Sequence, residues 1–261
     1  MVRVLVTGGT GVLGRELVPR LGKAGNIVRV MSRRAGESNA AGDVEWAQAD
    51  IMTGAGMAEA VRAVDVIIHA ASSPQKKTRE TDVEGTRRLL EAAKAAGVSN
   101  FYYISIVGID RIKYGYYEAK LAAEKVIEAA GAPYTILRAT QFHPLLGDVF
   151  LPMLVRGPFI FLPGSLKFQL IDAGEVADHM VQTLGNGPAG RLPDIGGPEV
   201  QTLSVIARDW LNARGKHPVT VPVPAVGFMR GMAKGYNCCP ENKFGKITWR
   251  EWLKQRYGSS A

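Results

Sequence analysis

Residues 2–14 of the chain are VRVLVTGGTGVLG, an apolar run that passes directly into a glycine-rich turn. Residues 2–6 are mostly β-branched or apolar and predict a buried strand. Residues 12–23 carry apolar side chains at helical spacing and predict an amphipathic helix. A helix that begins just after such a turn offers unpaired N–H groups and the positive end of its dipole, which favours phosphate binding.

The three glycines of this turn have separate roles. Gly8 permits the tight turn, Gly11 lets the backbone approach a pyrophosphate closely, and Gly14 lets the helix pack against the strand. We expect the phosphate contacts to come from Gly8, Thr10, Gly11, Val12 and Leu13.

Short apolar runs alternate with amphipathic runs as far as about residue 140. Strands are expected at residues 2–6, 27–31, 44–47, 64–69, 101–104 and 134–137. Helices are expected at residues 12–23, 56–62, 83–96 and 116–130. Strand–helix alternation repeated about six times predicts an α/β fold with a doubly wound parallel sheet.

The pattern changes after residue 140, where prolines and short aromatic runs become frequent. Helices are expected at residues 174–184, 203–213 and 248–257, and a short strand and turn at residues 191–197. We expect a nucleotide-binding core over residues 1–145. Residues 146–261 are expected to complete that core at about 165–200 and otherwise to form a smaller, discontinuous substrate lobe.

Composition excludes several classes of protein. The chain has 261 residues and a net charge of +8, but residues 201–261 hold 10 of the 32 basic residues and only 3 of the 24 acidic ones. Within them Trp249, Trp252 and Tyr257 lie at helical spacing and indicate a packing face, so a nucleic-acid partner is disfavoured. The two cysteines, Cys238 and Cys239, cannot form a disulfide framework or a four-ligand zinc site. Without a signal peptide or membrane span, we expect a cytoplasmic protein.

The end of the second predicted strand indicates which dinucleotide binds. The acid that would accept both ribose hydroxyls of NAD is missing there, and the chain reads Ser32, Arg33 and Arg34 instead. Two guanidinium groups and a hydroxyl suit an adenosine 2′-phosphate, which favours NADP(H). The alternative is that both arginines are simply solvated.

The glycine spacing, three residues from Gly8 to Gly11 and three more to Gly14, resembles the extended and atypical short-chain dehydrogenases/reductases. Over roughly residues 1–200 the chain is most similar to NmrA-like, NAD(P)H-binding members. The resemblance implies a Rossmann-type fold. It also implies cofactor contacts from Asp50 and Ile51 at the adenine and from the small residues Ala70, Ala71 and Ser72. Ser105, at the end of the fifth predicted strand, either contacts the cofactor or hydrogen-bonds to the backbone. Asp82 stands where the family usually has Asn.

Tyr116 and Lys120 lie four residues apart and therefore on one face of a predicted helix. A phenol donates a proton well to a forming alkoxide when an ammonium group lowers its pKa, and the lysine also holds the nicotinamide ribose. In short-chain dehydrogenases this pair is the catalytic motif, and Glu124 fits its extended version. Tyr114 and Tyr117 compete for the role, but neither has a lysine four residues later.

His143 follows the sixth predicted strand, where a catalytic role competes with simple packing. Apolar side chains nearby favour either an apolar substrate pocket or packing between lobes: Phe142, Phe150, Leu151 and Phe159.

Two functions remain open. The first is an NADPH-dependent oxidoreductase that transfers hydride to a carbonyl or quinone-like small molecule of apolar or aromatic character. The second is an NADP(H)-sensing regulator with little catalysis, in which the cofactor changes association with a protein partner or a second copy of the chain. The absence of a serine in the loop after the fifth strand, and Asp82, favour the second.

Overall fold

The computed structural model describes residues 1–34, 44–73 and 77–258. The chain divides into two compact units, and each is discontinuous in sequence. Unit 1 comprises Met1–Ser105, Gly115–Arg138 and Val176–Pro193, whereas unit 2 comprises Ile106–Tyr114, Ala139–Glu175 and Asp194–Ala261.

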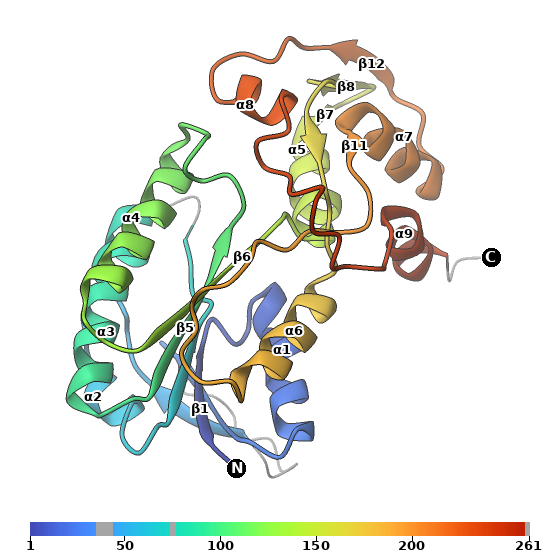
Figure 1. Ribbon diagram of the computed structural model, residues 1–261. Helices are drawn as coiled ribbons and strands as arrows, with labels where there is room; N and C mark the ends of the chain where they lie inside the picture. Colours follow the sequence, from blue (N-terminus) through green and yellow to red (C-terminus); the bar gives the residue numbers. More distant parts are fainter. Residues whose placement is uncertain (35–43, 74–76, 259–261) are drawn as a thin grey trace. The chain divides into compact units, whose positions relative to one another are not determined.

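Unit 1 is built on a seven-stranded parallel sheet of order β10-β6-β5-β4-β1-β2-β3. Its strands are β1 (Arg3–Thr7), β2 (Ile27–Ser32), β3 (Val44–Gln48), β4 (Val66–His69), β5 (Asn100–Ile106), β6 (Tyr134–Ala139) and β10 (Gly190–Arg191). Its helices are α1 (Val12–Lys23), α2 (Met57–Ala60), the π-helical η1 (Glu80–Gly85), α3 (Thr86–Ala95), α4 (Gly115–Ala129) and most of α6 (Ala173–Leu184). Figure 1 shows α2, α3 and α4 on one face of the sheet and α1 and α6 on the other, so the sheet is doubly wound.

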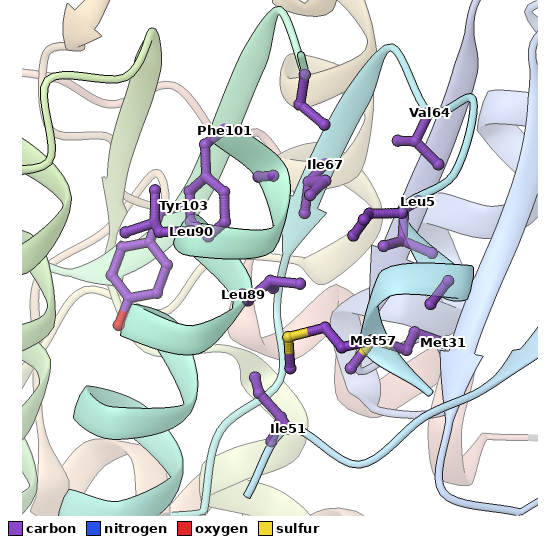
Figure 2. Close-up of a cluster of buried hydrophobic side chains, with 14 of the residues drawn as sticks. Leu5, Met31, Ile51, Met57, Val64, Ile67, Leu89, Leu90, Phe101 and Tyr103 are labelled. Atoms are coloured by element: carbon purple, nitrogen blue, oxygen red, sulfur yellow. The ribbon is translucent and has the colours of Figure 1, made fainter. Parts of the chain in front are cut away.

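One buried cluster of unit 1 lies between the sheet and the helices α2, α3 and α4. Leu5, Ile67 and Phe101 on neighbouring strands meet Leu89 and Leu90 of α3 in one buried cluster (Figure 2). Every residue of β4 is buried, as a central strand covered on both faces requires. The cluster therefore fixes α3 and α4 against the strands from whose ends the candidate site is built.

Unit 2 contains two small sheets of order β12-β8-β7 and β11-β9. Their strands are β7 (Val155–Arg156), β8 (Phe159–Leu162), β9 (Lys167–Phe168), β11 (Gln201–Thr202) and β12 (Val219–Pro222). The helical segments are η2 (Leu145–Phe150), α5 (Leu151–Leu154), α7 (Leu203–Ala213), α8 (Met229–Ala233) and α9 (Trp249–Tyr257). The expected packing face of the last helix is confirmed, because Trp249 and Trp252 are buried in the core of this unit.

The two cysteines lie in unit 2 as buried free thiols. The backbone N–H of Cys239 donates to Oε1 of the buried Gln169 at 2.8 Å, and Gln169 Nε2 donates to the carbonyl of Gly197 at 2.8 Å. Burial raises the pKa of Cys238 to about 11 and that of Cys239 to about 12.

The expected fold class is confirmed, and most helix and strand bounds agree within a few residues. Two differences matter for the site. The helix expected over residues 83–96 starts earlier, at Glu80, as a π-helix. The sequence also gave no sign of the two small sheets, whose strands are mostly two residues long. Within the described residues, none of the helices is both long and apolar enough to cross a bilayer.

Candidate functional site

The glycine-rich turn between β1 and α1 forms a tight cradle. Gly8 has a φ of +70°, which favours glycine, and a Cβ there would lie 2.7 Å from backbone atoms of Ala70. A Cβ on Gly14 would lie 2.2 Å from the Gly8 carbonyl oxygen. The Gly11 N–H donates to that same oxygen at 2.9 Å. No other residue type fits at Gly8 or Gly14 without moving the turn.

The N-terminus of α1 keeps its N–H groups available. Gly11 caps the helix without a side-chain hydrogen bond, and the first turn carries no acidic residue. Thr10, Gly11 and Val12 are exposed, so they lie where a ligand can reach them. Leu13 is buried, so its side chain packs in the core and only its backbone remains for a ligand. Exposed N–H groups at the positive end of a helix suit a phosphate.

Ser32, Arg33 and Arg34 lie at the carboxyl end of β2. Both arginines are exposed. Neither guanidinium group forms an ion pair within residues 1–34, 44–73 and 77–258. The Arg34 N–H donates to Ser32 Oγ at 3.3 Å. Gln48 Nε2 donates to the Arg33 carbonyl at 3.3 Å, which fixes this backbone against β3.

Asp50 and Ile51 follow β3 at the same edge of the sheet. Asp50 Oδ1 accepts the Met52 N–H at 2.8 Å, and its backbone N–H donates to Ala55. Ile51 is buried in the core, so its side chain packs beneath this turn. The Asp50 carboxylate therefore shapes the turn that follows β3.

A chain of hydrogen bonds crosses the ends of β1 and β4. Thr7 Oγ1 lies 2.6 Å from His69 Nδ1, and His69 Nε2 lies 2.9 Å from Thr86 Oγ1. The Ala71 N–H donates to Thr7 Oγ1 at 3.2 Å. His69 is fully buried, and desolvation, with a smaller contribution from the Lys120 charge, lowers its pKa to about 3. His69 is therefore a neutral structural residue that holds the loop after β4.

The carboxylate of Asp82 holds the next residues of that loop. Asp82 is almost fully buried, and its Oδ1 accepts a hydrogen bond from Ser72 Oγ at 2.6 Å. Its Oδ2 accepts the Ser73 N–H at 3.0 Å. Ser72 Oγ in turn lies 3.0 Å from the Tyr116 hydroxyl oxygen. Four residues from three segments of the chain are thus connected at the carboxyl end of β4.

Tyr116 and Lys120 lie on α4, as the spacing predicted. Tyr116 is half-buried, whereas Lys120 is 3% exposed. Lys120 Nζ donates to the Ile104 carbonyl at 2.8 Å and lies 4.0 Å from the centre of the Tyr103 ring. Desolvation lowers the pKa of Lys120 to about 8, while the charges of Asp82 and Glu124 oppose that shift. Lys120 is therefore an ammonium group at neutral pH.

Glu124 has a structural partner. Its carboxylate accepts from Arg138 Nε at 2.8 Å and from Arg138 Nη2 at 2.6 Å, and both side chains are 3% exposed. This bidentate ion pair ties α4 to β6. Glu124 therefore belongs to the support of the helix that carries Tyr116 and Lys120.

Two buried hydroxyls near the end of β5 have no hydrogen-bond partner within the described parts of the chain. They are Tyr103 Oη and Ser105 Oγ. Desolvation, with the nearby Asp82 charge, raises the pKa of Tyr103 well above its ordinary value. An unpaired buried hydroxyl is costly unless a ligand or water completes it. Ser105 therefore fits the predicted position of a ligand contact.

Candidates in unit 2 have different surroundings. His143 is fully buried and stacks on Trp249 and Trp252, with ring centroids 5.8 and 5.7 Å away. Desolvation lowers its pKa to about 4, so packing describes it better than acid–base chemistry. Leu151 and Phe150 pack in or against the core of unit 2, whereas Phe159 is exposed.

The sequence indicates that His69 is a core residue at a strand end, and the structure confirms this. The sequence does not predict the connection of Tyr116 to Asp82 through Ser72. From the sequence alone, Asp82 is a replacement for Asn, and Ser72 is a small residue expected to contact the cofactor. The sequence carries no local signal of this link, because Asp82 lies among polar residues such as Thr81 and Glu84, as in a solvated helix start.

Comparison with known proteins decides the family. The NAD(P)H-binding family matches residues 8–144, which is more than half of the chain. The chain belongs to this family of atypical short-chain dehydrogenases/reductases. The match begins in the glycine cradle and extends past Lys120, so it includes most of the residues described above.

Individual relatives of this NAD(P)H-binding protein differ in their names. The isoflavone reductase homolog of Zea mays is 28% identical over 201 residues, covering 69% of this chain and 63% of the relative. Quinone oxidoreductase 2 of Escherichia coli is 26% identical over 218 residues, covering 82% and 75%. A photosystem II assembly factor of Synechocystis is 30% identical over 162 residues, covering 59% and 49%. The chain spans about three fifths of the length of the first curated relatives it matches.

Solved structures support the fold of this family member. The NADPH complex of the E. coli quinone oxidoreductase has a TM-score of 0.79 at 19% identity, covering 97% of this chain and 99% of that one.

Proposed function

We propose that the chain is an NADPH-dependent reductase of a carbonyl or quinone-like small molecule, with Tyr116 as proton donor and Lys120 as its partner. The observation that carries this proposal is a half-buried phenol four residues before a buried ammonium, on the helix that follows β5. Similarity to a quinone oxidoreductase and an isoflavone reductase homolog supports the same reaction class.

The residues of unit 1 fit the cofactor. Gly8, Gly11 and the exposed N–H groups at the start of α1 would hold the pyrophosphate. The 2′-phosphate would be held by Ser32, Arg33 and Arg34. Their side chains offer a hydroxyl and two guanidinium groups, and none of the three is acidic. The contacts that remain are assigned to Asp50, Ile51, Ala70, Ala71, Ser72, Ser105 and Lys120. When bound, NADPH supplies a hydride to the substrate carbon.

The protein's own side chains would contribute a proton donor and a desolvated ammonium group beside it. The Tyr116 hydroxyl would donate its proton to the substrate oxygen as the carbon is reduced. The Lys120 ammonium, already desolvated and anchored on the Ile104 carbonyl, would stabilise negative charge on the phenol oxygen. The aromatic residues that follow residue 140 favour an apolar or aromatic substrate.

NADPH consumption against a panel of carbonyls and quinones tests the proposal. We expect turnover by the wild type, a loss of at least about 100-fold in kcat for Tyr116→Phe, and little change in NADPH affinity. Tyr114→Phe is the matched control, because Tyr114 stacks on Phe228 in unit 2 and phenylalanine retains that stack. Full activity of Tyr116→Phe would remove the assigned role.

The choice of NADPH over NADH has its own test. Arg33→Ala and Arg34→Ala should each weaken NADPH binding by roughly tenfold and leave NADH binding unchanged. Arg87→Ala is the control, because Arg87 is an exposed arginine paired with Glu84. Equal losses for both dinucleotides would contradict a 2′-phosphate site.

A second function is favoured by one observation, the similarity to photosystem II assembly factors. In that case NADPH occupancy would alter association with a protein partner or a second copy, without turnover. Gel filtration with and without NADPH, in the absence of substrate, separates the two functions. A cofactor-dependent change of assembly state with no NADPH consumption would favour the second.

A further inference from the structure

The Tyr116 hydroxyl is linked to a buried carboxylate through a single serine. Ser72 Oγ is 3.0 Å from the Tyr116 oxygen and 2.6 Å from Asp82 Oδ1. The three residues lie on α4, in the loop after β4, and in η1. All three belong to unit 1, so this geometry is internal to one compact body.

The direction of both hydrogen bonds follows from counting protons. A carboxylate only accepts, so the single Ser72 hydroxyl proton is directed at Asp82. Ser72 Oγ has then only its lone pairs left for Tyr116. In this contact Tyr116 is therefore the donor and Ser72 Oγ the acceptor.

The orientation of Asp82 is fixed in the same way. Thr86 Oγ1 donates to the Asp82 carbonyl at 2.6 Å, so it must accept from His69 Nε2–H. His69 Nδ1 then accepts from the Thr7 hydroxyl, and Thr7 Oγ1 accepts the Ala71 N–H. This chain holds Ala71 from one side while Asp82 holds Ser72 and Ser73 from the other. The loop after β4 is thereby placed before any ligand arrives.

We propose that Ser72 and Asp82 are positioning residues that hold the Tyr116 hydroxyl oxygen in place, so that its O–H can turn from Ser72 to the substrate oxygen for proton transfer. This inference rests on the proposed reductase function. As Tyr116 passes its proton to the substrate oxygen, the O–H bond of the phenol breaks and an O–H bond of the product alcohol forms. The Ser72 hydroxyl then rotates from Asp82 towards the phenolate oxygen and donates a hydrogen bond to it. Ser72 keeps its own proton throughout.

Several charged or titratable groups act on this arrangement. Asp82 approaches from η1, Lys120 and Glu124 lie on α4, and Tyr103 lies on β5. Glu124 is neutralised by Arg138, and Lys120 is anchored on Ile104. Asp82 is therefore the anion connected to Tyr116 by hydrogen bonds, and removal of its charge should favour the phenolate.

Tyrosine labelled with ¹³C at Cζ gives a direct readout in the protein without substrate. Tyr116→Phe assigns the resonance, which is then titrated in Asp82→Asn and Ser72→Ala. We expect Asp82→Asn to lower the titration midpoint of Tyr116 by about one pH unit. Ser72→Ala should shift the Tyr116 resonance at neutral pH, because the phenol loses its contact with Ser72 Oγ. Asp178→Asn and Ser99→Ala, on a surface pair and a distant turn of unit 1, should leave it unchanged.

Kinetics supply the second readout. Ser72→Ala should lower kcat at least about tenfold, a larger effect than its change in KM for NADPH, and Ser72→Thr should restore kcat. An unchanged Tyr116 resonance in both variants would refute the positioning role even if the protein is an active reductase. Conversely, a Tyr116 resonance that shifts in the variants, together with a wild type that consumes no NADPH, would support the Ser72–Asp82 link and refute the proposed reductase function.

Discussion

The buried pair of Glu124 and Arg138 predicts a large and specific loss of stability. Both side chains are 3% exposed and share two hydrogen bonds of 2.8 and 2.6 Å. Glu124→Ala leaves the Arg138 guanidinium buried beside β6 without its carboxylate. Removing one partner of a buried pair costs about 3–5 kcal/mol, which is a large share of the roughly 5–15 kcal/mol that stabilises a domain.

The assay is urea denaturation followed by far-ultraviolet circular dichroism. Glu124→Ala and Arg138→Ala should each lose about 3 kcal/mol or more. The double variant should be less destabilised than the sum of the two, with a coupling of about 2 kcal/mol, because no unpaired charge remains. Glu59→Ala is the matched control, since Glu59 and Arg62 form a pair that is 67% and 74% exposed. Its loss should be under about 1 kcal/mol.

A loss below about 1 kcal/mol for Glu124→Ala, or a coupling near zero, would refute the reasoning. The first result would mean that Arg138 finds water or another partner at little cost. The second would mean that the two side chains act independently in spite of their geometry.

Three further predictions follow from buried groups and close contacts. Gly14→Ala places a Cβ 2.2 Å from the Gly8 carbonyl oxygen and should weaken NADPH binding at least tenfold in a fluorescence titration. Gly22→Ala is the control in the same helix, because a Cβ on Gly22 meets no other part of the described structure within 4 Å, and it should leave NADPH binding unchanged. His69 is neutral in the folded protein, with a pKa of about 3, so the unfolded chain binds a proton at this histidine first as the pH falls. The contribution of His69 to the free energy of unfolding is therefore complete above about pH 6.5 and falls by roughly 3–5 kcal/mol towards pH 3. Urea titrations at several pH values should show a smaller pH dependence for His69→Gln. His143→Phe should retain the stack on the tryptophans and remove two buried ring nitrogens that lack partners in the described residues. Thermal melts should therefore show no loss of Tm at pH 7 and a higher Tm than the wild type below pH 6.

The sheet and the cradle were accessible from sequence because their signals are local. The run from Val4 to Gly14 joins a buried strand to a helix through glycines, and the structure has the expected turn there. The Tyr116–Lys120 spacing likewise needs only helical periodicity. The link from Tyr116 to Asp82 depends instead on segments more than thirty residues apart, and no periodicity reports such a contact.

The small sheets of unit 2 were inaccessible for a different reason. Strands of two residues, such as Lys167–Phe168, are too short for an alternating pattern. Glu124 is a third case. The sequence motif places it four residues after Lys120 but does not predict its bidentate contact with Arg138, because that contact forms only when β6 packs against α4. Local chemistry was therefore predictable, whereas long-range pairing was not.

The buried thiols of unit 2 also allow local opening of this unit to be measured by thiol labelling. Both cysteines of the chain lie in this unit, and their raised pKa values leave almost no thiolate at neutral pH. A thiol reagent can therefore react only after this part of the protein opens. The labelling rate of Cys239, measured with and without NADPH, would report whether cofactor binding in unit 1 changes the opening free energy of unit 2, without any added dye or engineered site.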